Sequence, residues 1–402
     1  MISSARPSTL RTRAISVTAV LMLSACGATE RLTRSDGAEL TPSEQAPSGR
    51  ASSDRTLDRR WVAPGPSDPQ AIAADDRGAV ASGRYGEIVA LDRRGREQWT
   101  LTVARDGEQT IHPVALGPDV AVVPVIPGRV VAVGRDRGDV RWSAAIQGPV
   151  AIDVDPASGS VVAVLTLGGI VDVLDSADGS VRWSTQLAFG EQAGPVSVGV
   201  RSSRVVAAWG DVGGSHLQVF DADSGRELWS AVAPLFSGTP AVTSDAVIVS
   251  ENLEADDRDV KARILRFDLA TGDLVWSHTL DGPFLPHLRV AVGRDVAAVV
   301  DVPGTLSALD LATGSLRWRQ RTRRKQYAAA PMLVGDVIAM ATYGTGLVAV
   351  AAADGTSVPN DAPGPVQTAV TFEGSAAAGR RLYLLGGRSR GEGEVWMLSA
   401  SP

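Results

Sequence analysis

Short stretches of alternating apolar and polar residues recur along the chain between residues 57 and 400. Examples are IVALD at 88–92, IVDVLD at 170–175 and LSALD at 306–310. Alternation with a period of two residues is typical of a strand that buries one face. Because each stretch is followed by a turn signal and then by another apolar segment, the pattern predicts an all-β fold built from many short hairpins.

A glycine and a tryptophan follow six of these stretches in the same phase. The tryptophan lies four residues after the glycine in every copy, and successive tryptophans are separated by 43, 41, 46, 47 and 42 residues. The pairs are Gly95 and Trp99, Gly138 and Trp142, Gly179 and Trp183, Gly225 and Trp229, Gly272 and Trp276, and Gly314 and Trp318. A period of this length indicates a repeat architecture.

The segment between the alternating stretch and the tryptophan predicts a tight turn. In four copies an aspartate stands four residues before the glycine, namely Asp175, Asp221, Asp268 and Asp310. Its carboxylate can accept backbone N–H bonds, and glycine adopts positive φ without steric cost. The tryptophan on the next strand is large and flat enough to cover a neighbouring sheet. One such unit buries too little of itself to be stable, so the copies must stack as propeller blades do.

The consensus Ala/Leu-x-Asp-x-x-Thr-Gly-x-x-x-Trp resembles the tryptophan-docking repeat of quinoprotein-like, or PQQ-like, β-propellers. The best copies run from Ala308 to Trp318 and from Phe267 to Trp276, and the resemblance covers essentially all of residues 57–400. Two copies depart from it. Gly134 replaces the aspartate in the second, and the turn after Asp92 is one residue shorter in the first.

The number of blades follows from the two ends of the repeat. A seventh copy at 347–355 has Pro359 in the tryptophan position, and strand-like runs remain at 381–386 and 394–399. Trp61 stands alone before the first complete copy. We expect it on the fourth strand of the last blade, whose first three strands are C-terminal, because this closure removes free sheet edges. The sequence thus predicts an eight-bladed β-propeller of four-stranded blades, with seven blades as the alternative.

Residues 1–25 are predicted to form a lipoprotein signal peptide. Three arginines precede an apolar run from Ala14 to Leu23, which is too short to cross a bilayer as a stable helix. The stretch Leu-Ser-Ala-Cys ending at Cys26 resembles the lipobox of bacterial lipoproteins, which implies that Cys26 carries acyl chains. Residues 26–56 comprise this cysteine and a polar segment that predicts a flexible tether. Residues 57–402 are then the propeller.

Composition excludes several classes of function. Without the signal peptide the chain has 36 basic and 45 acidic residues, a net charge of −9, so nonspecific binding to nucleic acid is not expected. Cys26 is the single cysteine, which excludes an intrachain disulfide and a cysteine metal site. The histidines His112, His216, His278 and His287 form no close-spaced pair and predict no metal site.

No motif in the chain predicts catalysis. Dehydrogenases among the resembled propellers are expected to carry a vicinal disulfide, a calcium site and extra loops, and a single cysteine excludes the first of these. The string Gly-Arg-Ser-Arg-Gly at 387–391 matches a hydrolase motif but lies between two strand patterns, without the helix that the motif needs. Residues 344–346 are likewise predicted to connect two strands and not to form a phosphate-binding loop. We expect no enzyme activity, no cofactor and no metal.

Two segments carry more charged residues than the repeat pattern requires. Residues 251–263 form a charged insertion, and residues 317–325 carry six basic side chains within nine positions. Each is either a solvated loop or a contact surface for a partner or an anionic ligand. The basic residues Arg319, Arg321, Arg323, Arg324 and Lys325 are expected on the connection between the sixth and seventh blades.

These features favour an exported, monomeric lipoprotein that acts as a protein-interaction scaffold for an unknown protein partner. Its N-terminal lipid would hold it at the outer face of the cell membrane, or in the outer membrane of a host with two membranes. The layout is similar to that of the propeller lipoproteins of the outer-membrane β-barrel assembly machine, which dock partner proteins. The alternative is a propeller that binds a small molecule or quinone in its central channel without redox catalysis.

Overall fold

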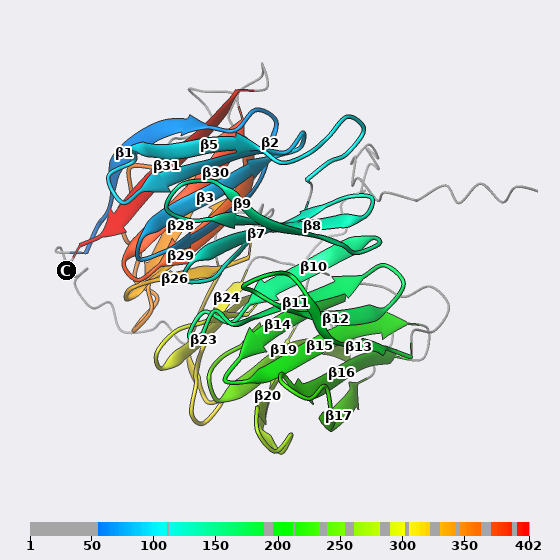
Figure 1. Ribbon diagram of the computed structural model, residues 1–402. Helices are drawn as coiled ribbons and strands as arrows, with labels where there is room; N and C mark the ends of the chain where they lie inside the picture. The colour runs from blue at the N-terminus through cyan, green and yellow to red at the C-terminus, as the bar shows by residue number, and fades with distance from the viewer. Residues whose placement is uncertain are drawn as a thin grey trace, which may run out of the picture. The chain divides into compact units, whose positions relative to one another are not determined.

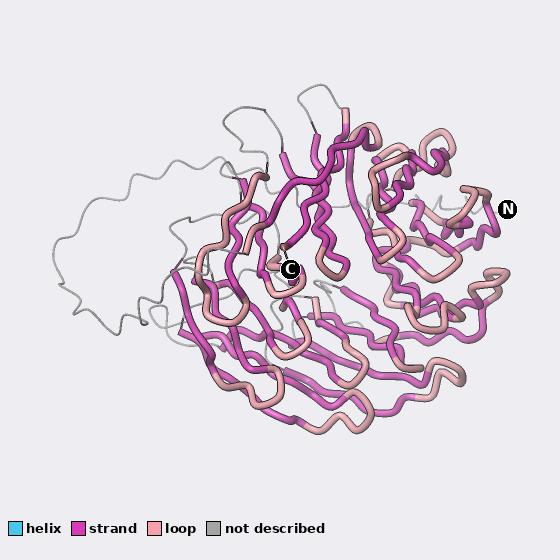
Figure 2. Tube along the Cα trace, turned by 90° about the vertical axis from the view of Figure 1, so that its left-hand side faces the viewer, coloured by secondary structure: helices cyan, strands magenta, loops and turns pink. Residues whose placement is uncertain are grey.

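A computed structural model describes residues 55–110, 112–188, 196–211, 214–233, 239–253, 261–281, 290–301, 305–321, 330–342, 346–362, 371–387 and 392–401. Every regular element in these ranges is a β-strand, as the magenta and pink tube of Figure 2 shows. They contain no helix long and apolar enough to cross a membrane. The predicted all-β class is confirmed.

The first four blades are antiparallel sheets of four strands that follow one another in the chain. Blade 1 is β2 (Pro69–Asp75), β3 (Gly78–Gly83), β4 (Glu87–Asp92) and β5 (Glu97–Thr102). Blade 2 is β6 (Ala115–Leu116), β7 (Val120–Val125), β8 (Arg129–Gly134) and β9 (Val140–Ala145). Blade 3 is β10 (Pro149–Val154), β11 (Val161–Thr166), β12 (Ile170–Asp175) and β13 (Val181–Gln186). Blade 4 is β14 (Val196–Arg201), β15 (Arg204–Asp211), β16 (Gly214–Asp221) and β17 (Glu227–Ala233).

The remaining blades continue the same hairpin order. Blade 5 is β18 (Ala241–Val242), β19 (Ala246–Leu253), β20 (Lys261–Asp268) and β21 (Leu274–Asp281). Blade 6 is β22 (Ala291–Val292), β23 (Val296–Val300), β24 (Thr305–Asp310) and β25 (Leu316–Arg321). Blade 7 is β26 (Met332–Val334), β27 (Val337–Thr342) and β28 (Gly346–Ala351). Blade 8 is β29 (Thr371–Ala378), β30 (Arg381–Gly387), β31 (Gly393–Ala400) and β1 (Leu57–Gly65).

The N-terminal strand closes the last blade, as the sequence predicted. The sheet order is β1-β31-β30-β29, and Trp61 pairs with Met397 across an antiparallel register. Figure 1 shows this closure as the blue strand β1 beside the red strand β31. The strands form eight sheets, of which the last combines the N-terminal strand with the three C-terminal ones, so the ring has eight blades. The seven-blade alternative is wrong.

Blade 7 departs from the four-stranded pattern. Its sheet has three strands, and a single bridge between Val350 and Ser357 stands where the fourth would run. The start of β1 covers this position instead, because the Leu57 N–H donates to the Pro359 carbonyl at 2.9 Å. Leu57 is fully buried between blades 7 and 8. At the interface between blades 7 and 8, which has no repeat tryptophan, the closing strand β1 therefore fills the space.

The core is divided among the joints between blades. Eight apolar clusters of buried residues occur, and each combines side chains from two adjacent blades. Between blades 2 and 3, for example, Val122 and Val130 pack with Val162 and Val164. This arrangement explains the need for stacking, because each sheet obtains its core from its neighbours.

Candidate interaction surface

Seven tryptophans join consecutive blades through one recurring contact. Each indole N–H donates to a backbone carbonyl in a turn of the next blade, at 2.7–3.0 Å. Donors and acceptors are Trp61 and Arg93, Trp99 and Arg135, Trp142 and Ser176, Trp183 and Ala222, Trp229 and Leu269, Trp276 and Leu311, and Trp318 and Ala352. Gly272 shows why the turn needs glycine, because its φ is +78° and a Cβ there would lie 2.7 Å from Cδ2 of Trp229.

Where the repeat aspartate is present, it holds the turn that receives the tryptophan. In blade 6 the Asp310 carboxylate accepts the backbone N–H groups of Ala312 and Thr313 at 3.1 and 2.9 Å. The guanidinium of Arg317 donates to the same carboxylate at 2.7 Å and lowers the pKa of Asp310 to about 2. The predicted role of the repeat aspartate is thus confirmed.

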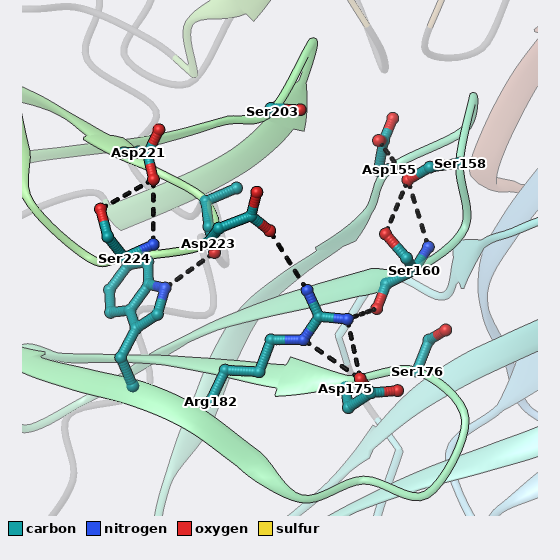
Figure 3. Close-up of polar contacts among 12 residues, drawn as sticks. Asp155, Ser158, Ser160, Asp175, Ser176, Arg182, Ser203, Asp221, Asp223 and Ser224 are labelled. Atoms are coloured by element: carbon teal, nitrogen blue, oxygen red, sulfur yellow. Dashed lines mark hydrogen bonds and ion pairs between the residues drawn. The ribbon is translucent and has the colours of Figure 1, made fainter.

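Arginines on the outer strands are largely neutralised at these turns. Arg182, shown in Figure 3, donates to Asp175 at 2.7 Å and lies 3.4 Å from Asp223 of the next blade. In blade 6, Arg317 pairs with Asp310 and also with Asp295, at 2.9 Å. Blade 2 lacks the repeat aspartate, and there Arg141 pairs with Asp139 at 3.1 Å beside Gly134. The local carboxylates leave little net positive charge at these positions.

The first turn differs because it is shorter. Its hydrogen bond runs from the Gly95 N–H to the Asp92 carbonyl at 3.0 Å, which makes Arg93 and Arg94 the two central residues of a four-residue turn. Both arginines are exposed. Within the described ranges, neither guanidinium has a carboxylate at ion-pair distance. As far as the described residues show, this turn therefore presents two uncompensated charges to solvent.

An open groove surrounds this turn. It has a volume of about 840 Å³ and is lined by residues of blades 1, 2 and 8: Asp76, Arg77, Asp92, Arg93, Arg94, Arg96, Gln98, Asp136 and Arg381. Arg77 pairs with Asp136, Arg96 with Asp92 at 2.7 Å, and Arg381 with Asp76 at 3.8 Å. The five arginines exceed the three carboxylates, so the groove is basic although the chain is acidic. We call it the arginine groove.

The Asp92 carboxylate stays ionised in this setting. Burial acts to raise the pKa of Asp92, but the backbone N–H and the guanidinium of Arg96 outweigh it, and the pKa lies below its usual value. The carboxylate also accepts the Arg94 N–H at 2.8 Å. The short turn was visible in the sequence, but the groove was not, because its residues come from four separate segments. The adjacent pair Arg93 and Arg94 was the visible signal.

The basic segment at 317–325 is only partly as predicted. Arg317, Arg319 and Arg321 lie on strand β25, and Arg319 pairs with Asp301 at 3.3 Å. Placing Arg319 and Arg321 on the blade connection was wrong, because the strand continues for three residues beyond Trp318. Arg323, Arg324 and Lys325 lie outside the described residues.

The two ends of the charged insertion at 251–263 lie on strands and not in a solvated loop. Strand β19 runs to Leu253 and β20 begins at Lys261. Glu251 is 0% exposed and pairs with Arg263 on the neighbouring strand. The loop interpretation is wrong for these two residues, since a buried carboxylate needs such a partner. Residues 254–260 lie outside the described part of the chain.

The central channel is lined by the innermost strands of all eight blades. Its volume is about 770 Å³, and most lining side chains are alanine, valine and other small residues. Asp75, Asp153 and Arg201 add charge, and Arg201 donates to the Asp153 carboxylate at 2.7 Å. Burial raises the pKa of Asp153 against the influence of Arg201. No aromatic side chain is among the lining residues that the structure describes.

The other candidates from the sequence are separated in space or lie outside the described residues. His216 stacks on Trp209 at a centroid distance of 5.0 Å, and no group of three His, Cys, Asp or Glu suited to a metal occurs among the residues described. Cys26, His287 and residues 388–391 and 343–345 are outside those ranges. Lipidation of Cys26 stays a prediction.

Comparison with known proteins gives one consistent family. The family model described as outer membrane protein assembly factor BamB matches residues 84–212, 213–358 and 260–401. The protein of that name from Burkholderia pseudomallei is 27% identical over 306 residues, covering 70% of this chain and 73% of its own. The structure of BamB from Moraxella catarrhalis aligns with a TM-score of 0.64 and 17% identity, over 85% of this chain and 99% of its own.

The same fold also occurs in a protein of another function. Quinohemoprotein alcohol dehydrogenase from Comamonas testosteroni aligns with a TM-score of 0.57 and 13% identity, over 86% of this chain and 76% of its own. At this identity the likeness concerns the fold alone. It agrees with the predicted resemblance to quinoprotein-like propellers, which host several functions.

Proposed function

This chain belongs to the family of outer membrane protein assembly factor BamB, and we propose on that premise that it is an exported, lipid-anchored scaffold that docks a partner protein. The family match, which extends over residues 84–401, carries the proposal. Because the relatives are named as assembly factors and not as enzymes, we propose a role without catalysis.

The membrane attachment is proposed for Cys26. The lipobox-like stretch before it and the absence of any other cysteine in the chain support this assignment. Two or more acyl chains provide stable anchoring, whereas one chain provides only reversible binding. The Cys26→Ser variant is expected to leave the detergent phase in which wild type is recovered. Equal partitioning of the two proteins would contradict the anchor.

Docking is tested by affinity capture from solubilised membranes. The tagged wild-type chain is expected to recover at least one protein in near-stoichiometric amount, after crosslinking and mass spectrometry. A host with two membranes would supply a component of the β-barrel assembly machinery, and a host with one membrane another exported protein. Recovery of no protein above the untagged control would contradict the scaffold role.

A second candidate function rests on the central channel. A volume of about 770 Å³, with a wall of mixed polar and apolar surface and a few charged groups, is in the range of small-molecule sites. Native mass spectrometry of the purified chain would detect a small molecule or quinone retained there. Loss of such a ligand in an Ala151→Trp variant would support this function, and a ligand-free wild type would count against it.

A further inference from the structure

We propose that the arginine groove binds an acidic segment of a partner protein, with Arg93 and Arg94 as its principal charged contacts. This inference rests on the proposed scaffold function and adds the kind of partner and the place where it binds. It follows from three features of the groove, which are its free charge, its fixed backbone and its interspersed carboxylates.

At one turn, two adjacent exposed arginines have no carboxylate at ion-pair distance among the described residues. The repeat arginines Arg182 and Arg317 each pair with two carboxylates, so their charge is already compensated. Arg93 and Arg94 are exposed and, as far as the structure describes the chain, have no such partner. In a chain with a net charge of −9 after the signal peptide, two adjacent free arginines favour encounter with a negatively charged partner.

The backbone that carries these arginines is fixed before any partner binds. The Arg93 carbonyl accepts the indole N–H of Trp61 at 3.0 Å, and the indole packs against Gly95. From the other side, the Asp92 carboxylate accepts the N–H groups of Arg94 and Arg96 at 2.8 and 3.0 Å. A turn held in this way loses little backbone entropy on binding, which favours affinity.

The carboxylates in the groove favour a peptide over a lipid surface. Asp76, Asp92 and Asp136 line the groove together with the arginines, and each of them pairs with one arginine. A flat layer of anionic headgroups would meet these carboxylates as well as the arginines. An extended peptide can place its own carboxylates against the arginines and keep them away from Asp76 and Asp136. Guanidinium groups bind carboxylates through paired hydrogen bonds, which adds directional preference.

The test compares two double charge reversals in the full-length mature protein in neutral detergent. The R93E/R94E variant changes the groove. The control R226E/R294E changes two exposed arginines on turns of blades 4 and 6. The probe is a fluorescent peptide of about twelve residues in which Glu alternates with Ser, long enough in extended form to span the groove. Thermal unfolding of each variant verifies that the ring is intact.

Wild type is expected to bind the probe saturably, and the affinity is expected to fall as salt rises. R93E/R94E should weaken binding about tenfold, because each exposed pair contributes modestly and reversal adds repulsion. The control should remain within about twofold of wild type. No saturable binding by wild type, or an equal loss in both variants, overturns the inference. Stronger competition by glycerol phosphate than by unlabelled peptide would also overturn it, since it would indicate a phosphate headgroup.

Failure of this inference can be told apart from failure of the scaffold role. If wild type captures no protein from membranes, the scaffold role fails. If wild type and R93E/R94E capture the same protein equally well, the scaffold role stands and the groove assignment fails. Selective loss of the captured protein in R93E/R94E supports both.

Discussion

Replacement of Trp61 by alanine tests ring closure through a side chain outside the six-copy repeat. Three contacts would be lost. The hydrogen bond to the Arg93 carbonyl contributes about 1 kcal/mol. The edge contact with Tyr383, at a centroid distance of 6.0 Å, contributes about 1 kcal/mol. Partial burial of the ring against Gly95 and its neighbours adds about 1–2 kcal/mol. We therefore expect W61A to lower the free energy of unfolding by about 3 kcal/mol.

Trp183 provides a matched reference inside the repeat. It is half-buried like Trp61, donates to the Ala222 carbonyl at 2.8 Å and has an aromatic neighbour in Phe220 at 5.9 Å. W61A and W183A should therefore lower the stability to urea by amounts within about 1 kcal/mol of each other. W61F keeps a ring and loses the N–H, so it should cost about 1–2 kcal/mol.

Urea unfolding followed by circular dichroism measures these differences. If the N-terminal strand were only an appendage, W61A would remain within about 0.5 kcal/mol of wild type while W183A would be strongly destabilised. That result would refute closure by β1. Deletion of residues 27–50 serves as a further control and should leave the unfolding midpoint unchanged, because these residues are predicted to be tether.

Two further changes address the turns and an ion pair between blade 2 and the segment that precedes it. Gly272→Ala should lower the free energy of unfolding by about 3 kcal/mol or more, measured by thermal unfolding. Gly107 also has a positive φ, +83°, but a Cβ there would meet no atom within 4 Å, so Gly107→Ala should cost only about 1 kcal/mol. Similar losses in the two variants would refute close packing of the Gly272 turn on Trp229. Hydrogen bonding from Arg129 lowers the pKa of Glu108 from 4.5 to about 2. The pair therefore stabilises the fold above pH 4.5, and this contribution is lost as the pH falls toward 2. Glu108→Gln should thus be less stable than wild type at neutral pH, with a difference that shrinks in acid; a difference independent of pH would refute the pairing.

The fold could be predicted largely from the sequence because each repeat carries its own signals. The spacing of glycine and tryptophan determines the position of the turn and of the outer strand, and these local patterns repeat in phase. Closure of the ring by the strand of Trp61 was also predictable. No strands of the same blade precede Trp61, and the C-terminal strands had no fourth strand of their own. The three-stranded sheet of blade 7 was harder to predict from the sequence, since Leu57 covers its edge through backbone hydrogen bonds with Pro359 and Asp361, which are distant in the chain.

The candidate site could not be predicted in the same way. The arginine groove joins turns from blades 1, 2 and 8, and its character depends on which arginines find carboxylate partners. Arg317 and Arg319 belong to a basic run in the sequence. In the folded chain, however, Asp295 and Asp310 pair with Arg317, and Asp301 pairs with Arg319. Charge density along a sequence does not report such pairing, because the partners come from other strands and turns.

Photocrosslinking in intact cells determines whether the propeller holds a protein partner at the arginine groove. A photoreactive amino acid is placed at Gln98, which lines the groove, and in a separate strain at Arg226, which lies on an exposed turn of blade 4. One dominant crosslinked protein is expected from position 98. It should be absent from position 226 and lost when Arg93 and Arg94 are changed to glutamate. Equal crosslinking from both positions, or none from position 98, would contradict docking at the groove.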